Sequence, residues 1–345
     1  MNVVKEHKPA DADLMDLAIA QAEHGRLLAP PNPWVGAVVV TETGTVYPGY
    51  TQRPGDEHAE RVALRRAGRA AEGATLFVTL EPCSHQGRTP PCVGPIVASK
   101  VSRVVVGIAD PDSNVSGSGI EQLRHAGIDV EVGVGSDAIE IQLASYLHHR
   151  RTGQPYVVLK SAATMDGRTA APDQTSQWIT GDEARADAHR LRAMSDAIVV
   201  GAGTVRADNP SLTVRGVIAA DNKPPREPLR VVLGEAPPDA EVRPCLEHSG
   251  TIGDLLVRLG ADGVVSVLVE GGAEVAAQFH RAGVVNRYVM YFAPALMGGD
   301  DGRAIFAGLG SSTISDVFRG TLDRVQQLGN DVRIDILPTV VPDEV

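Results

Sequence analysis

The first 150 residues alternate between short apolar runs and longer segments whose apolar residues follow helical spacing. The short runs predict buried strands at 35–41, 75–80, 101–109 and 128–132. The helical spacing predicts helices at 13–22, 60–67, 119–126 and 136–147. Strands that alternate with helices indicate a largely parallel sheet with crossover helices, and such sheets bind ligands at the carboxyl ends of their strands. We therefore expect an α/β domain.

A polar, basic segment interrupts this pattern at 148–155, where the chain runs His-His-Arg-Arg-Thr-Gly-Gln-Pro. Its charge, together with the glycine and proline at its end, predicts a linker. A length of 345 residues is typical of two domains. We therefore expect one domain at 1–147 and a second at 148–345.

The second half again shows strand and helix patterns. Apolar runs predict strands at 156–163, 197–200, 229–233 and 264–269, and a helix is expected at 181–193 with Thr180 as its N-cap. Glycine-rich turns follow two of the strands, at 201–204 and 270–272. Glycines between a strand and a helix allow phosphates to approach the backbone. Neither turn is the G-x-G-x-x-G fingerprint, so spacing favours a dinucleotide site only modestly.

Charge and composition exclude several classes of protein. The net charge of −11 argues against a nucleic-acid partner, because phosphate backbones are bound by basic surfaces. The chain has no apolar run of membrane-spanning length and no signal-peptide pattern at its N-terminus, so we expect a cytoplasmic protein without a membrane partner. With only three cysteines in such a chain, a disulfide is not expected.

Two of the cysteines and one histidine have the chemistry of a metal site. His58 begins a predicted helix, Cys83 follows the strand at 75–80, and Cys92 lies nine residues further on. Three protein ligands leave the fourth position of a zinc ion for water, which is the arrangement of a catalytic site. The alternative, buried thiols beside a surface histidine, does not account for a helix start and a strand end that both carry ligands.

Glu60 stands two residues after His58, in the position of a proton carrier. Zinc-dependent nucleobase deaminases have an H-x-E motif followed by a proline-cysteine pair, and their glutamate is an acid/base and not a ligand. Metal coordination lowers the pKa of bound water to about 7, but protons must still be moved to the leaving group. In this chain eight residues separate the cysteines instead of two, and Gly87, Pro90 and Pro91 provide the turns of the longer loop.

Asn32 and Asp110 each allow two interpretations. Asn32 lies in a proline-rich segment before the first strand, where it is either a turn residue or an amide that contacts a pyrimidine edge. Asp110 follows a strand and either caps a turn with Pro111 or contacts a ligand. The residues alone do not separate these roles.

Together, several motifs of the first half resemble the deaminase half of the bifunctional riboflavin-biosynthesis deaminase/reductases. They are Asn-Pro at 32–33, His-Ala-Glu at 58–60, the stretch 83–92 with Thr-Pro-Pro at 89–91, and Ala-Asp-Pro at 109–111. The resemblance implies a cytidine-deaminase-like three-layer domain with zinc. It also implies the substrate 2,5-diamino-6-ribosylamino-4(3H)-pyrimidinone 5′-phosphate, contacted by Asn32, His85, Arg88 and Asp110. Asp112 and Ser118 stand where the family usually has asparagine and lysine.

The second half resembles the reductase half of the same family. The motifs include Met-Asp-Gly at 165–167, Ser-Gln-Trp-Ile-Thr at 176–180, Asp-Asn-Pro at 208–210 and Glu-Gly-Gly at 270–272. The resemblance implies a dihydrofolate-reductase-like fold that uses NADPH to convert the ribosyl group to ribityl, giving 5-amino-6-ribitylamino-uracil 5′-phosphate. The implied NADPH site consists of Ala162, Trp178, Thr204, Asp208 and Gly272. The implied substrate site consists of Ser176, Arg192, Leu212, Arg215 and Glu270, whose two arginines suit a phosphate.

Three hypotheses follow. The first is a bifunctional enzyme that deaminates a phosphorylated pyrimidine and then reduces it. The second is a single-function zinc deaminase whose second domain binds a nucleotide without reducing anything. The third is a zinc-stabilised scaffold without chemistry. A homo-oligomer is compatible with each of them.

Overall fold

The computed structural model describes residues 10–86, 89–112 and 115–339. The chain forms two compact units. The first consists of residues 1–152 with 218–225, and the second of residues 153–217 with 226–345. Among the described residues, none of the helices is both long enough and apolar enough to cross a membrane.

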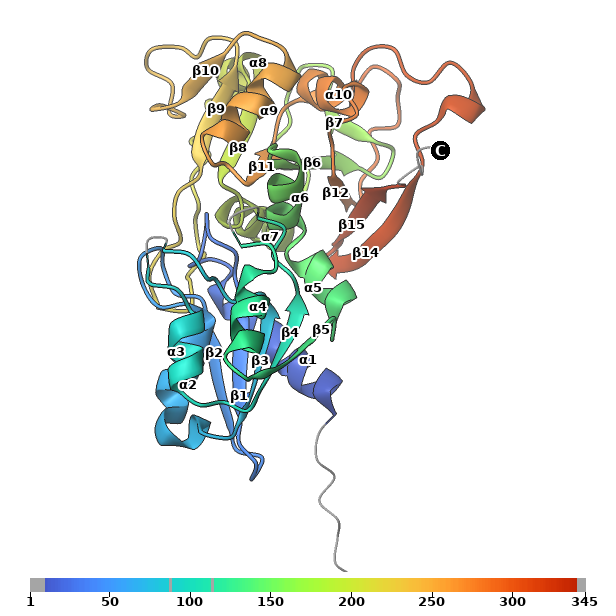
Figure 1. Ribbon diagram of the computed structural model, residues 1–345. Coiled ribbons are helices and arrows are strands. Elements are labelled where there is room, and N and C mark those ends of the chain that lie inside the picture. The colour runs from blue at the N-terminus through green and yellow to red at the C-terminus, as the bar shows by residue number, and fades with distance from the viewer. Residues whose placement is uncertain (1–9, 87–88, 113–114, 340–345) are drawn as a thin grey trace, which may run out of the picture. The chain divides into compact units, whose positions relative to one another are not determined.

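Unit 1 is built on a five-stranded sheet with the order β2-β1-β3-β4-β5 (Figure 1). Its strands are β1 (Gly36–Val40), β2 (Val46–Tyr50), β3 (Thr75–Leu80), β4 (Arg103–Ile108) and β5 (Asp129–Val132). The last three run parallel, whereas β1 is antiparallel to both of its neighbours. β1, β3 and β4 are almost wholly buried, as expected for strands covered on both faces. The strands predicted in this half are confirmed.

Helices cover both faces of this sheet. They are α1 (Asp11–Gly25), α2 (Ala59–Ala67), α3 (Val93–Ala98), α4 (Ser118–His125), α5 (Ser136–Gln142) and α6 (Ala144–Thr152). Two glycines show how closely helices approach the strands. A Cβ on Gly36 would lie 1.8 Å from the carbonyl oxygen of Ala18 in α1, and one on Gly49 would lie 2.3 Å from that of Ala59 in α2. Because Gly49 pairs with Ala37, the residue after Gly36, the two glycines face opposite sides of the sheet. The expected three-layer domain is confirmed.

The helix expected at 136–147 and the linker expected at 148–155 are both corrected by the structure. The helical segment is interrupted at Leu143, and α6 continues to Thr152 through the residues that we assigned to the linker. Tyr146, Leu147 and His149 of α6 are buried, so one face of this polar helix is buried. Its charged residues are typical of the exposed face of a helix as much as of a loop, which is why the linker prediction was wrong for 148–152.

Unit 2 contains an eight-stranded sheet with the order β10-β9-β8-β11-β6-β12-β15-β14. The strands from β10 to β12 are parallel, and β15 and β14 are antiparallel additions. A separate small sheet pairs β7 with β13. The strands are β6 (Tyr156–Thr164), β7 (Arg168–Ala170), β8 (Ala197–Gly201), β9 (Leu229–Leu233), β10 (Leu246–His248), β11 (Ser266–Val269), β12 (Arg287–Ala293), β13 (Arg303–Ala304), β14 (Gly320–Leu328) and β15 (Asp331–Pro338).

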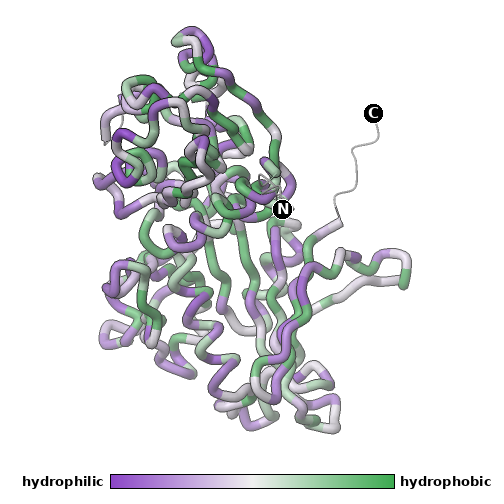
Figure 2. Tube along the Cα trace, turned by 90° about the horizontal axis from the view of Figure 1, so that it is seen from below, coloured by the Kyte–Doolittle hydropathy of each residue, from purple (hydrophilic) through white to green (hydrophobic). Residues whose placement is uncertain are grey.

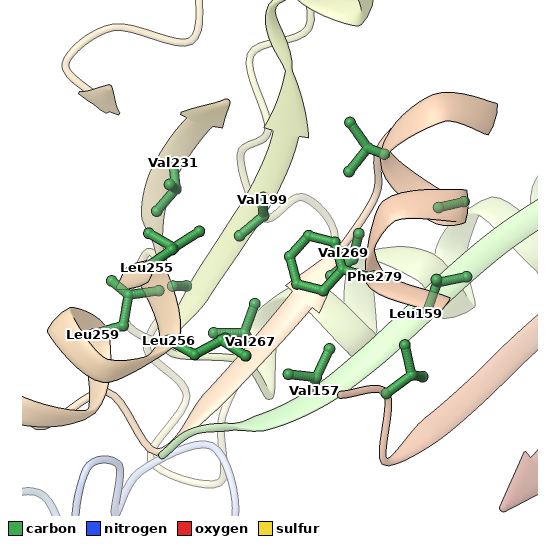
Figure 3. Packing of buried hydrophobic residues seen from close by; sticks show 14 of the residues in the cluster. Val157, Leu159, Val199, Val231, Leu255, Leu256, Leu259, Val267, Val269 and Phe279 are labelled. Atoms are coloured by element: carbon green, nitrogen blue, oxygen red, sulfur yellow. The ribbon is translucent and has the colours of Figure 1, made fainter. Parts of the chain in front are cut away.

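Two hydrophobic clusters fix the helices of unit 2 to its sheet. In the first, Leu255, Leu256 and Leu259 project from α9 (Ile252–Ala261) toward valines of the strands, and Phe279 of α10 (Ala273–Arg281) fills the space beside them (Figure 3). The second cluster includes Leu191 of α7 (Asp182–Ala193) and side chains of α8 (Ala202–Asp208). Each large side chain buried in this way stabilises the fold by about 1.5–3 kcal/mol. Figure 2 shows green hydrophobic stretches alternating with purple hydrophilic stretches along the chain.

The start of α7 differs from the sequence prediction. Gly181, and not Thr180, is the N-cap, and its side chain has no atom that could cap the helix. The Gly181 N–H donates instead to Asp331 at 2.7 Å, a residue 150 positions away. A long-range carboxylate therefore occupies the start of the helix, where the helix dipole favours negative charge.

Candidate active sites

Three elements of unit 1 bring the predicted metal ligands together. His58 is the N-cap of α2, Cys83 lies three residues beyond the end of β3, and Cys92 is the N-cap of α3. Their ligand atoms all lie within 4.8 Å of one another. The loop of eight residues between the cysteines therefore closes on one point, and the predicted ligand set is assembled without any change of backbone.

The three predicted ligands contact one another, and His58 also contacts a hydroxyl group. His58 Nδ1 lies 3.6 Å from the sulfur of Cys83 and 3.3 Å from that of Cys92, and its Nε2 lies 3.0 Å from the hydroxyl of Thr89. A hydrogen bond with Cys83 raises the pKa of His58. Hydrogen bonding with Cys92 lowers the pKa of Cys83 to about 4, and the same contact raises that of Cys92. The Cys83 sulfur is thus favoured as a thiolate, which is the form that binds a divalent cation.

Glu60 lies in the first turn of α2 and is only 3% exposed. Burial raises its pKa, while the neighbouring His58 opposes the shift. A carboxyl group whose pKa is raised takes up a proton more readily than a free one, which suits a residue that transfers protons.

A cavity of about 220 Å³ joins this metal-binding group to most of the residues predicted to contact substrate. Its lining includes His58, Glu60, Cys83, Asn32, His85 and Asp110. Asn32 thus lies at a pocket, in agreement with the second of its two interpretations, although its backbone also forms a turn. Arg88 lies outside the described residues.

Asp110 combines the two roles that the sequence left open. Its side chain accepts a hydrogen bond from the backbone N–H of Asp112 at 2.9 Å, which is a local turn, and it also lines the cavity. The hydroxyl of Tyr146 donates to both carboxylate oxygens at 3.0 Å. Burial raises the pKa of Asp110 to about 6, against the effect of these hydrogen bonds.

Three further residues of this site were missed by the sequence analysis. Glu81 is buried, and its carboxylate accepts backbone N–H groups from Asp110, Gly117, Gly119 and Ile120. It therefore holds the loop after β4 beside the metal-binding loop. Tyr146 and Arg150 reach the cavity from α6. Their spacing of four residues is a helical signal that was hidden because the segment after 147 was assigned to a linker.

In unit 2, three residues of the predicted NADPH site lie at the carboxyl ends of neighbouring strands. Ala162 is near the end of β6, Thr204 is in α8 just after β8, and Gly272 is the N-cap of α10 after β11. The Gly272 N–H donates to the Thr204 hydroxyl at 3.2 Å. Asp208 ends α8 and is exposed, and Trp178 is 69% exposed. These strand ends lie at the edge of the sheet where open parallel sheets usually bind ligands.

The predicted substrate residues of unit 2 surround a buried ion pair. Arg192 donates to the two carboxylate oxygens of Glu270 at 2.6 and 2.9 Å and to the carbonyl of Thr213 at 3.2 Å. Burial alone would raise the pKa of Glu270, but the hydrogen bonds from Arg192 hold it below its usual value. Most of the Arg192 fork is therefore occupied, which differs from the arrangement expected for a phosphate ligand, whereas Arg215 is exposed.

The other residues predicted for this substrate site differ in burial. Leu212 is buried, and Ser176 is half-buried in the loop after β7. Lys160 on β6 was quoted only as part of a motif, yet burial lowers its pKa, and the nearby Glu270 opposes this shift. A buried lysine beside the Arg192–Glu270 pair is a chemical feature that periodicity alone does not reveal.

Two family models match the chain in the order of the two units. The cytidine and deoxycytidylate deaminase zinc-binding region matches residues 8–108, and the RibD C-terminal domain matches residues 155–334. The first match contains all three predicted zinc ligands. The second covers more than half of the chain.

Whole-length relatives agree with this division. The riboflavin biosynthesis protein RibD of Mycobacterium tuberculosis is 40% identical, over 97% of this chain and 99% of its own. That of Escherichia coli is 37% identical over 95% and 99%. A solved structure of Acinetobacter baumannii RibD has a TM-score of 0.90 at 36% identity, over 95% of this chain and 99% of its own. The Thermotoga maritima deaminase/reductase has a TM-score of 0.83 at 32% identity, over 95% and 98%. This chain therefore belongs to the RibD family, the bifunctional deaminase/reductases of riboflavin biosynthesis.

Proposed function

We propose that unit 1 binds one zinc ion and hydrolytically deaminates 2,5-diamino-6-ribosylamino-4(3H)-pyrimidinone 5′-phosphate, and that unit 2 then reduces the product with NADPH. The Thermotoga relative is described as a diaminohydroxyphosphoribosylaminopyrimidine deaminase and 5-amino-6-(5-phosphoribosylamino)uracil reductase. The observation that carries the proposal is that His58, Cys83 and Cys92 bring their ligand atoms within 4.8 Å of one another, beside a cavity that the buried Glu60 also lines.

The three ligands fit zinc by their chemistry. Two sulfurs and one imidazole nitrogen are the donors that zinc prefers, and three of them leave a position for water. The Thr89 hydroxyl contacts the other ring nitrogen of His58 at 3.0 Å, and such contacts fix the orientation of a ligating histidine. When bound, zinc supplies an activated water at neutral pH.

Glu60 transfers the protons of the deamination. It takes a proton from the attacking water as the carbon–oxygen bond forms, and it gives a proton to the departing amino group, so that water enters and ammonia leaves. Because Glu60 is buried next to the ligands and is not required as a ligand, it can change protonation state without loss of the metal. Asn32, His85 and Asp110 line the cavity and hold the pyrimidine, and Arg88 is proposed to join them.

In unit 2, NADPH supplies the hydride that opens the ribosyl group to ribityl. Ala162, Thr204 and Gly272 form the strand-end edge where the cofactor is proposed to bind, with Trp178 and Asp208 as its outer contacts. An N–H group at the start of α10 is available for a phosphate of the cofactor. These residues would hold the cofactor at this edge of the sheet, from which it would supply its hydride to the substrate.

Ser176, Arg192, Leu212, Arg215 and Glu270 are proposed to hold the substrate of the reductase. The two arginines of this set differ, because Arg192 is hydrogen-bonded to Glu270, whereas Arg215 is exposed. We therefore assign the phosphate contact chiefly to Arg215, and we assign to Arg192 the orientation of Glu270.

The proposal is tested by coupling the two reactions. The purified protein is assayed for zinc by elemental analysis, for ammonia release from the pyrimidine substrate, and for NADPH oxidation. We expect one zinc ion per chain, ammonia release without NADPH, and NADPH oxidation only after deamination. NADPH oxidation with the substrate that still carries its amino group would contradict the order of the two steps, and absence of oxidation on the deaminated compound would favour the single-function alternative.

A further inference from the structure

One wall of the deaminase cavity is formed by α6, whose second half, 148–152, was predicted to be part of a linker. Tyr146 and Arg150, four residues apart, both line the cavity. The Arg150 guanidinium lies over the Tyr146 ring, 5.0 Å from its centroid, and its Nε is 3.1 Å from the carboxylate of Asp112. Tyr146 in turn donates to Asp110. Four side chains thus form one connected wall.

Exposure increases along this wall from the metal-binding group outward. Tyr146 and Asp110 are buried, with 4% and 6% of each residue exposed, whereas the side chains of Asp112 and Arg150 are 19% and 32% exposed. The cavity of about 220 Å³ is smaller than the roughly 300–1,000 Å³ of typical small-molecule sites. A substrate whose ring reaches the metal-binding group must therefore extend toward the mouth, where Arg150 lies.

Carboxylates outnumber cationic side chains in the described lining of the cavity. Its described lining contains four carboxylates, those of Glu60, Glu81, Asp110 and Asp112, and Arg150 is the one lysine or arginine among the lining residues that the structure describes. A phosphate monoester carries close to two negative charges at neutral pH. Among these lining residues, the Arg150 guanidinium is the side chain of opposite charge that such a phosphate could contact away from the metal-binding group.

We propose that Arg150 binds the 5′-phosphate of the deaminase substrate and so makes the first reaction selective for the phosphorylated compound. The inference rests on the proposed deaminase function. A guanidinium has five N–H donors in a planar fork, so a salt bridge to Asp112 leaves donors for a second anion. Asp112 holds the side chain in place, and the Tyr146 ring supports its face, so that little side-chain freedom is lost when the phosphate binds.

The competing explanation is that Arg150 only neutralises Asp112. Three variants separate the two: Arg150→Met, Asp112→Asn and their combination. Each is assayed as intact, zinc-loaded protein for deamination of the phosphorylated substrate and of the same compound without its phosphate. Arg151→Met is the matched control, because Arg151 is the next residue of the same helix and pairs with the exposed Glu140.

If Arg150 binds the phosphate, Arg150→Met lowers kcat/KM for the phosphorylated substrate by about tenfold or more, as for the loss of a charge-assisted hydrogen bond, and leaves that for the dephosphorylated compound nearly unchanged. The double variant, like Arg150→Met, should no longer prefer the phosphorylated substrate to the dephosphorylated compound. Recovery of the phosphorylated substrate in the double variant, or equal losses with both compounds, would overturn the proposal. Arg151→Met should behave as the unaltered protein.

Failure of this proposal can be told apart from failure of the proposed function. If the unaltered protein binds zinc and releases ammonia from the phosphorylated substrate, the deaminase function stands whatever Arg150 does. If the unaltered protein fails to release ammonia, both the function and the role of Arg150 fall. Reduction of a previously deaminated substrate, measured with the same variants, should not change, and a loss there would show general damage to the chain and would also contradict the assignment.

Discussion

The metal centre of unit 1 and the ligand-binding edge of unit 2 are assembled in different ways. His58, Cys83 and Cys92 come from one stretch of 35 residues, and their ligand atoms already lie within 4.8 Å of one another. The proposed NADPH residues are taken from 162 to 272, and two of them, Trp178 and Asp208, are exposed. A metal needs its ligands at fixed distances, so short local loops suffice. A long cofactor needs an extended edge, which only the folded sheet provides.

The largest difference between the two sites should appear when a metal ligand is removed. We expect Cys83→Ala to lose zinc and to abolish deamination, because two remaining ligands hold zinc weakly, while reduction of a deaminated substrate persists. Zinc content and both activities would be measured. Cys245→Ala is the matched control, since this thiol lies in unit 2 and outside the predicted ligand set. Full zinc content in Cys83→Ala would remove Cys83 from the ligand set.

A second variant separates binding from chemistry within unit 1. Glu60→Gln is expected to keep zinc and to lower deamination by about 10²- to 10⁴-fold, the usual contribution of a positioned acid/base group. Glu57→Gln serves as the control, because Glu57 is nearby and pairs with the exposed Arg65. Loss of zinc in Glu60→Gln would place Glu60 among the ligands.

The same contrast explains what the sequence could predict. The ligands and Glu60 were found because helix starts and strand ends are signalled by local pattern, and a metal requires particular residue types there. Periodicity also predicted most strands of unit 1 and four of the strands of unit 2, and β3 and β9 have the bounds expected for them, but β12, β14 and β15 were not predicted. The roles in unit 2 came from family resemblance, because residues at separate strand ends meet only through the order β8-β11-β6.

Other features depended on contacts that no local pattern records. Residues 148–152 of α6 were predicted to be a linker because polar and basic residues are adjacent there, and only packing shows that His149 is buried. The N-cap of α7 was misplaced because a distant carboxylate, Asp331, binds the first N–H of the helix. Likewise, nothing in the sequence showed that Glu270 would occupy the fork of Arg192.

That ion pair gives the third prediction, which concerns unit 2. Glu270→Gln leaves Arg192 largely buried with a neutral partner, and breaking a buried pair from one side costs about 3–5 kcal/mol of stability. We expect the reductase to be inactivated at a lower temperature, with deaminase activity less affected. The two activities would be followed after heating.

A matched control for this variant exists on the surface of the same unit. Arg243 and Glu247 also lie 2.6 Å apart, but both side chains are 36% exposed. Glu247→Gln should therefore change stability by about 0–1 kcal/mol. Equal effects of the two substitutions would mean that burial does not distinguish the pairs and that Glu270 has no special structural role.

The smallest expected effect concerns the wall of the deaminase cavity. Burial raises the pKa of Asp110 to about 6, above its ordinary value of 3.8, while the Tyr146 hydroxyl and the backbone N–H of Asp112 act to lower it. The folded protein therefore binds this proton more readily than the unfolded chain does. Its contribution to stability is present below pH 3.8 and is lost as the pH rises through about 6. Activity depends on pH in the opposite sense if the ionised carboxylate holds the substrate.

Tyr146→Phe tests this dependence while keeping the aromatic ring. Without the hydroxyl, the ionised form of Asp110 loses a hydrogen bond, so its pKa should rise further, by about one pH unit for a bond of about 1.5 kcal/mol. The acidic limb of kcat/KM for deamination should then move to higher pH by about that amount, with zinc content unchanged. The pH profile of the reductase in the same protein is the internal control, because Tyr146 belongs to unit 1. An acidic limb that stays in place would mean that ionised Asp110 does not contact the substrate and serves only the turn with Asp112.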